Sequence, residues 1–180
     1  YTASNTLSLH DALPISRSKS IQTTPAHQLA LAAVYYSPLQ YMYWYDKPSD
    51  SQDEPELKFF DDVYTTWDDT KVLQGEVGEF ITIARRKGEE WFIGSITNNE
   101  KRVLSVSLDF LPEGKNYIAE IYTDGDKSVK TRTKVRVSTY RVSNKTKLNF
   151  CLKASGGAAV RLVPDDGNIK SVKNYKQQRL

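Results

Sequence analysis

Cysteine is nearly absent from this 180-residue chain, which has Cys151 alone. A single thiol excludes a disulfide within the chain and a metal site built from several cysteines. No apolar run approaches the roughly 20 residues that a membrane-spanning helix requires. An excess of one charge is also missing, because 25 basic residues are interleaved with 22 acidic ones and the net charge is only +3. That balance lacks the basic footprint of a nucleic-acid-binding protein, so we expect neither nucleic acid nor a membrane as a partner.

Aromatic residues, in contrast, are plentiful, with 11 Tyr, 3 Trp and 6 Phe. Aromatic side chains suit the half-buried surfaces of β-strands, which favours a β-rich domain. Stacking of rings against sugars is the second interpretation that the composition leaves open.

The first residues match a translated DNA adapter. The stretch TLSLHDALPI at positions 6–15 is the translation, in one frame, of the common sequencing adapter ACTCTTTCCCTACACGACGCTCTTCCGATCT. The longer form of the adapter, with its index, accounts for residues 1–5, and its last base can open the codon of Ser16. We therefore expect residues 1–16 to be a disordered artefact and exclude them from the fold. This interpretation implies that the natural protein is truncated on its N-terminal side.

A helix is predicted from Thr24 to about Gln40. Thr24 can cap it, and Pro25 suits the first helical position, where a missing N–H costs nothing. Apolar residues then recur at helical spacing, and Pro38 should kink or end the helix. The apolar face is broad and the sequence offers it no helical partner, so we expect the helix to be the last element of a preceding domain, within residues 17–45.

The period changes to two after residue 68, which predicts an antiparallel β-sandwich over residues 69–164. Turn residues separate eight short segments of strand type. The segments are KVLQGEV, EFITIARRK, EWFIGSIT, RVLSVSLDF, NYIAEIYTD, TRTKVRVST, KLNFCLK and AAVRLVP.

The segments that flank the predicted sandwich are polar. Residues 46–68 contain Pro48 and Pro55 and are interpreted as a linker, with a short helical turn in ELKFFDDV. Residues 165–180 are basic and show no pattern, and we predict that they are disordered.

Several segments together are similar to the C-terminal part of glycoside hydrolase family 97. They are TPAHQLALAAVYYSPLQ, WYDKP, EPELKFFDDVYTTWDDTKVLQGEVGEFITIARRKGEEWFIGSITN, DFLPEGKNYIAEIYTDG and SGGAAVRLVP, which span about residues 23–164. The resemblance implies that the predicted helix is the last helix of a (β/α)8 barrel and that the strands form the C-terminal sandwich.

The resemblance also implies the properties of the whole protein. Members of the family are calcium-dependent α-glucosidases or α-galactosidases that act on oligosaccharides, mostly in the periplasm. A periplasmic or secreted location is therefore expected. Glycoside hydrolysis needs two carboxyl groups, and the family places these and its calcium ligands in barrel strands that precede this part. No catalytic residue, metal ligand or cofactor is therefore expected here, and the missing barrel would be the main partner.

Two places are candidates for contact with substrate. Thr24 and His27 lie at the start of the predicted helix, which in a barrel faces the catalytic side. The alternative is that Thr24 caps the helix and His27 is an interfacial histidine. Trp67, Asp68 and Asp69 combine a ring for stacking with carboxylates for hydroxyl groups. Their alternative is that Trp67 packs between the sandwich and the barrel while the aspartates cap a turn.

Three functions remain open for the domain as a whole. It supports the barrel of a glycosidase, it forms homo-oligomers, or it is an autonomous carbohydrate-binding or protein-interaction module. The binding module would need an exposed row of rings. Trp91 and Phe92 are adjacent in a predicted strand, so only one of them could face outward. We favour the first function. The tyrosines and the tryptophan of positions 35–45 are expected to pack at the seam between the domains.

Overall fold

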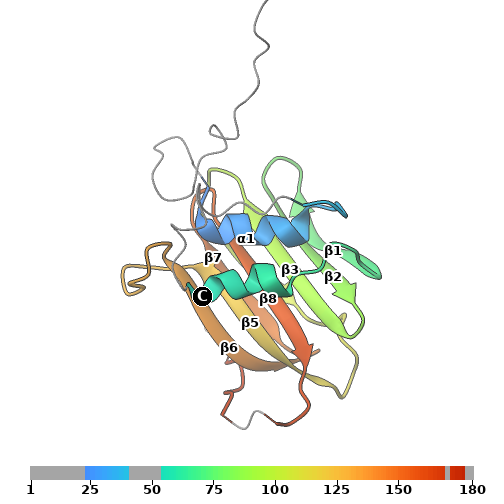
Figure 1. The fold of residues 1–180 in the computed structure, drawn as a ribbon. Helices are drawn as coiled ribbons and strands as arrows, with labels where there is room; N and C mark the ends of the chain where they lie inside the picture. Colours follow the sequence, from blue (N-terminus) through green and yellow to red (C-terminus); the bar gives the residue numbers. More distant parts are fainter. Residues whose placement is uncertain (1–22, 41–53, 169–170, 177–180) are drawn as a thin grey trace, which may run out of the picture.

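The computed structural model of the chain describes residues 23–40, 54–168 and 171–176. The eight predicted strands are present, and antiparallel pairing arranges them in two sheets (Figure 1). The larger sheet has the order β1-β2-β3-β8-β5-β6, and β4 pairs with β7 in the smaller one. The strands are β1 Asp69–Glu76, β2 Phe80–Lys87, β3 Glu90–Thr97, β4 Arg102–Ser107, β5 Asn116–Asp124, β6 Val135–Ser143, β7 Lys147–Leu152 and β8 Gly157–Pro164. The interpretation of residues 1–16 as adapter and the aromatic run at 41–45 fall outside the described residues.

The core of the sandwich lies between the two sheets. It is built from one face of each strand, with Trp91 and Ile93 from β3, Leu104 from β4 and Phe150 from β7 among its buried members. The predicted antiparallel sandwich is therefore confirmed. The largest difference in a strand concerns β6, which begins at Val135 and not at residue 131. Lys134, just before it, has a φ of 53°, a left-handed conformation that a regular strand does not accommodate.

The longest helix of the described residues, α1, spans Pro25–Val34. Thr24 caps it and Pro25 occupies the first turn, as predicted. The helix ends earlier than predicted, since Tyr35 is already extended, and Tyr36 and Leu39 are 70% exposed instead of continuing the apolar face. A residue from another part of the chain caps the C-terminal end of the helix. Arg85 on β2 donates to the carbonyl oxygens of Ala33 and Val34, at 2.5 and 2.9 Å. No helix within the described part of the chain is long and apolar enough to cross a membrane.

The apolar face of α1 is covered within this chain by a sheet, because α1 packs on the outer face of the larger sheet, mainly on β3 and β8. Gly94 on β3 and Gly157 on β8 lie directly under it. A Cβ atom on Gly94 would lie 2.5 Å from the Ala30 carbonyl oxygen, and one on Gly157 would lie 2.6 Å from the Cα of His27. The absence of two side chains thus lets the helix backbone approach the sheet closely.

A second helical segment lies beside α1 on the same face (Figure 1). It consists of the 3-10 turn η2, Pro55–Leu57, and α2, Lys58–Asp62, and it contains the helical turn that the sequence predicts. Phe59 is fully buried and its ring makes edge contacts with Phe92 and Tyr122 at 6.0 and 5.3 Å. This part of the predicted linker is therefore integrated into the fold, because it covers apolar residues on the outer face of the sheet.

The prediction of disorder after residue 164 is wrong for residues 171–176, which lie along the edge of β6. Asn174 forms a parallel bridge with Arg141, whose N–H donates to the Lys173 carbonyl and whose carbonyl accepts from Tyr175. The Tyr175 ring packs against Tyr140, and its hydroxyl accepts the N–H of Asn149 on β7. The segment therefore joins the edge of the larger sheet to the smaller sheet.

We predict that Gly94→Ala destabilises the chain by about 1–3 kcal/mol, as overpacking in a tight interior does. The reason is that the new methyl group would displace the α1 backbone, which cannot move without losing its contacts with the sheet. Urea unfolding followed by tryptophan fluorescence measures the change. Gly75→Ala on the exposed edge strand β1 is the control, since its nearest contact is longer, at 3.1 Å. Equal midpoints for Gly94→Ala and the wild type would contradict the close packing.

A second prediction concerns Tyr175. Tyr175→Phe keeps the ring but removes the hydroxyl acceptor of the Asn149 N–H, and should cost about 1 kcal/mol. Tyr175→Ala should cost more, because the contact with Tyr140 is also lost. Both are measured by urea unfolding. If neither variant differs from the wild type, the segment does not stabilise the sandwich.

Candidate functional site

Thr24 and His27 hold the start of α1 against the loop between β7 and β8. The Thr24 hydroxyl accepts the N–H of His27 at 3.2 Å, and the Thr24 N–H donates to the Ser155 carbonyl at 3.0 Å. The buried His27 ring bonds the Gly156 carbonyl through Nδ1 at 3.1 Å. Burial lowers the pKa of His27, although the bond to Gly156 and the nearby Asp124 carboxylate oppose that effect. These contacts are those of a cap and an interfacial histidine, and contact with a sugar stays a prediction.

Trp67, Asp68 and Asp69 lie at the start of β1, where Trp67 packs beside Tyr64 and Phe92 with ring centroids 6.4 and 5.5 Å away. Asp68 accepts the Gly88 N–H at 2.8 Å and pairs with Lys87, and these two contacts lower its pKa. Asp69 accepts the N–H of Thr70 at 2.8 Å. Asp68 therefore fixes the turn between β2 and β3, and a role of these residues in sugar binding stays a prediction.

The structure does not bring the two candidate places together. Trp67 packs on Phe92 near the start of β3, whereas His27 lies over Gly157, which pairs with Ile96 near the end of that strand. A strand rises about 3.3 Å per residue, so these positions are separated by roughly 13 Å along β3 alone. They do not form one substrate site within the described residues.

The adjacent carboxylates in the sequence serve as partners of basic residues. In the three adjacent pairs Asp61-Asp62, Asp68-Asp69 and Glu89-Glu90, five of the six carboxylates form ion pairs: Asp62 with Lys58 and Arg161, Asp68 with Lys87, Asp69 with Lys71, Glu89 with Lys115, and Glu90 with Arg161. A glycosidase needs a protonated acid and a free carboxylate facing each other across a sugar. The five carboxylates named above are instead held by basic partners.

The densest charge cluster surrounds Arg161, on the outer face of β8. Its guanidinium contacts Asp62 at 2.6 Å and Glu90 at 2.8 Å, and Glu120 also pairs with Lys58 at 3.0 Å. Burial disfavours the charged guanidinium, but the hydrogen bond to Glu90 and the neighbouring carboxylates outweigh this and raise the pKa of Arg161. The cluster ties α2 to three strands.

Nowhere in residues 23–40, 54–168 and 171–176 do three or more His, Cys, Asp or Glu gather as metal ligands would.

The aromatic residues of the strands face inward on both sides of the larger sheet. Trp91 is buried in the sandwich core, and Phe92 is buried under the helices. Strand alternation allowed Trp91 or Phe92 to face solvent, but neither does. Helices cover the second face of the sheet, so both rings are buried. The exposed large rings of the described residues are Tyr35, Tyr36 and Tyr64, which lie outside the strands. Tyr35 and Tyr36 thus form no buried seam within this chain.

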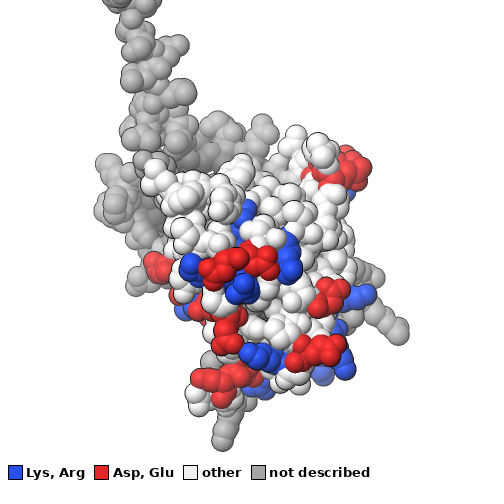
Figure 2. Space-filling model, turned by 90° about the vertical axis from the view of Figure 1, so that its right-hand side faces the viewer, with Lys and Arg blue, Asp and Glu red and all other residues white. Residues whose placement is uncertain are grey.

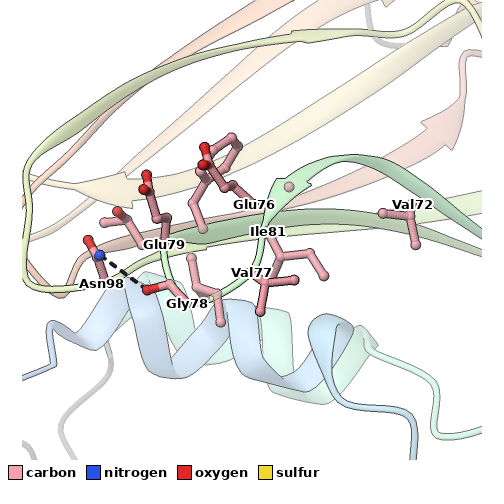
Figure 3. A pocket seen from close by; sticks show the side chains of 11 residues that line it. Val72, Glu76, Val77, Gly78, Glu79, Ile81 and Asn98 are labelled. Carbon is pink, nitrogen blue, oxygen red and sulfur yellow. Dashed lines mark hydrogen bonds between the residues drawn. The ribbon is translucent and has the colours of Figure 1, made fainter.

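An apolar groove of about 540 Å³ lies beside the β1–β2 hairpin, and we call it the hairpin groove. Its apolar lining comprises Val72, Gly75, Val77, Ile81 and Ile96. In Figure 3, Val77 and Ile81 point toward the side of the helices, whereas Glu76 and Glu79 point the other way. Figure 2 shows acidic and basic groups interleaved on this side of the molecule, with a large uncharged area above them. The sequence predicted no groove here, and Val77 next to Gly78 in the β1–β2 turn is a local signal for it.

Comparisons with known proteins agree on one family. The profile of the family described as "Glycosyl-hydrolase 97 C-terminal, oligomerisation" matches residues 66–163. The retaining alpha-galactosidase of Bacteroides thetaiotaomicron is 34% identical over 142 residues, which cover 78% of this chain and 21% of that protein.

Solved structures extend the match to three dimensions. A glycoside hydrolase family 97 enzyme from Pseudoalteromonas sp. strain K8 in complex with acarbose has a TM-score of 0.72 and 37% identity, over 79% of this chain and 23% of that chain. A glycoside hydrolase family 97 enzyme from the same strain in complex with panose has a TM-score of 0.71. A beta-arabinopyranosidase, at 24% identity and a TM-score of 0.62, shares the fold. The chain thus spans less than a quarter of the length of these relatives.

We predict that stability falls in mild acid because of His27. Its pKa is lowered in the folded state from the ordinary value of 6.5, so the unfolded chain takes up the proton first as the pH falls. The contribution of the neutral ring is full above 6.5 and is lost as the pH falls from there toward the lowered folded pKa. Urea midpoints at about pH 7.5 and about pH 5.5 measure the effect. In the His27→Gln variant, the difference between the two midpoints should be smaller. If the difference is the same as in the wild type, other groups cause the pH dependence.

Proposed function

Because the chain belongs to the glycosyl-hydrolase 97 C-terminal family, we propose that it is the non-catalytic domain of an enzyme that hydrolyses α-glycosidic bonds of oligosaccharides. The observation that carries this proposal is the match to family 97 enzymes over most of the chain, at 34% and 37% identity. The retaining alpha-galactosidase and the enzymes bound to acarbose and panose support a glycosidase as the whole protein.

The chemistry would reside in the preceding part of the full-length protein. Asp68, Glu89 and Glu90 are tied into ion pairs, and within the described residues no three or more His, Cys, Asp or Glu gather as metal ligands would. We therefore propose that both catalytic carboxyl groups, and the calcium that the family resemblance implies, belong to the catalytic barrel.

The role of the domain would be mechanical. α1 is the candidate last helix of the barrel, and it is also packed on the sandwich through Gly94 and Gly157. A helix that belongs to both domains would hold the sandwich in a fixed orientation relative to the barrel. Burial of apolar area at about 25 cal/mol per Å² would make the sandwich a stabiliser of the barrel.

Two further properties are proposed from the family. Its description includes oligomerisation, which supports contact between copies of the full-length protein. A periplasmic or secreted location is proposed from the same resemblance.

The test uses the purified chain and the full-length enzyme. We expect the chain alone to release no p-nitrophenol from p-nitrophenyl α-glucoside or α-galactoside above a heat-treated control. Deleting the sandwich from the full-length enzyme should lower the melting temperature of the catalytic part by several degrees, because an apolar contact surface becomes exposed. Release of product by the isolated chain would overturn the assignment as a non-catalytic domain. An unchanged melting temperature would overturn the supporting role.

A further inference from the structure

We propose that the hairpin groove binds a helix of the catalytic domain that precedes α1 in the full-length protein. This inference rests on the proposed function and assigns the docking surface and its occupant. The occupant would present an apolar face to Val72, Val77 and Ile81, alongside α1.

The groove lies on the uncovered part of an otherwise covered sheet face. α1 crosses β3 and β8, and α2 adds Phe59 over Phe92 and Tyr122. Beyond α1, the outer face of β1 and β2 carries Val72 and Ile81, which have no described helix over them. Packed helices lie about 8–10 Å apart, so a helix beside α1 would lie over this part of the sheet.

Two of the exposed large apolar side chains of the described residues, Val72 and Val77, line this groove. Val72 is 67% exposed and Val77 fully exposed, although both are large apolar residues. Tyr36, at 70% exposure, extends the surface, because its ring stacks with Arg85, which in turn bonds Thr70 on β1. Contiguous apolar surface of this kind marks a contact with another protein part.

The groove is preformed, because hydrogen bonds hold its rim. The Asn98 side chain donates to the Gly78 carbonyl at 3.2 Å (Figure 3). The Asn98 N–H donates to the Glu79 carbonyl at 2.7 Å. Glu79 also pairs with Arg102 at 2.9 Å. The hairpin tip is thereby fixed to β3 and β4, and an incoming helix would not have to order it.

The path of the chain favours the preceding domain as the occupant. The Thr24 N–H donates to Ser155, the Ser155 N–H donates to Asn98, and Asn98 lines the groove. The chain therefore reaches α1 at the same end of the sheet as the groove, and in the relatives most of the protein lies outside the matched part.

The size of the groove also favours a partner within the same chain. A groove of about 540 Å³ is small beside a stable interface between separate proteins, which takes roughly 20–30 residues a side. A domain linked through α1 has a high effective concentration, so a smaller contact suffices.

Thiol accessibility tests the proposal. In a Cys151→Ser background, Val77→Cys and, separately, Val72→Cys are introduced into the isolated chain and into the full-length enzyme. Labelling with a maleimide is followed by peptide mass spectrometry. We expect each thiol to react at least about tenfold more slowly in the full-length enzyme, because the docked helix must open first. Val103→Cys on β4, which is 55% exposed away from the groove, should react equally fast in both.

Equal labelling rates at positions 72 and 77 in both proteins would overturn the proposal. If deletion of the sandwich still lowers the melting temperature, the supporting role stands and only the assignment to the groove fails. If labelling of the isolated chain slows as its protein concentration rises, a second copy of the chain occupies the groove. That result would also overturn the proposal. Two positions are used so that disturbance of docking by one thiol does not decide the result.

Discussion

The close contact between the backbone of α1 and the two glycines beneath it determines how the remaining structure is arranged. Gly94 and Gly157 lie on the neighbouring strands β3 and β8, and the absence of their side chains leaves room for the helix backbone. Once the helix lies there, its first turn meets Gly156 through His27 and its last carbonyls meet Arg85. The same position leaves Val72 on β1 and Ile81 on β2 without a described helix over them. A helix held further from the sheet would lose both end contacts, and the sheet would lose its second covered face.

The larger sheet is covered on both faces along β3 and β8, and this explains their composition. Trp91, Phe92 and Ile93 are consecutive and all buried, as are Ala158, Ala159 and Val160. Strands of the smaller sheet, such as β4, instead alternate between buried and exposed residues. The molecule is thus a three-layer arrangement in which the helices belong physically to the sandwich. The family profile begins at residue 66, yet the fold begins at α1.

The strands could be predicted from the sequence because glycine, asparagine and proline mark nearly every turn between them. The start of α1 was equally predictable, since its cap and its proline are local. Its end was not, because the side chain that terminates it, Arg85, is some fifty residues away in the sequence. The ordered segment around Tyr175 escaped prediction for a similar reason: its partners, Tyr140 and Asn149, are distant and its own residues are polar. Of the predicted site residues, Thr24 and Asp68 have contacts that account for them locally, and the hairpin groove emerged only in three dimensions.

The bridge between Arg141 and Asn174 also has a consequence for biosynthesis. During translation β6 leaves the ribosome before β7, β8 and residues 173–175, so its outer edge stays unpaired while the sheet assembles. An unpaired edge can recruit strands of other nascent chains. The last segment to emerge therefore acts as a closing step that removes this template once the sandwich is complete. At the opposite edge, β1 has a bulge between Val72 and Gln74 from the moment it pairs with β2, so that edge is irregular without waiting for a later segment.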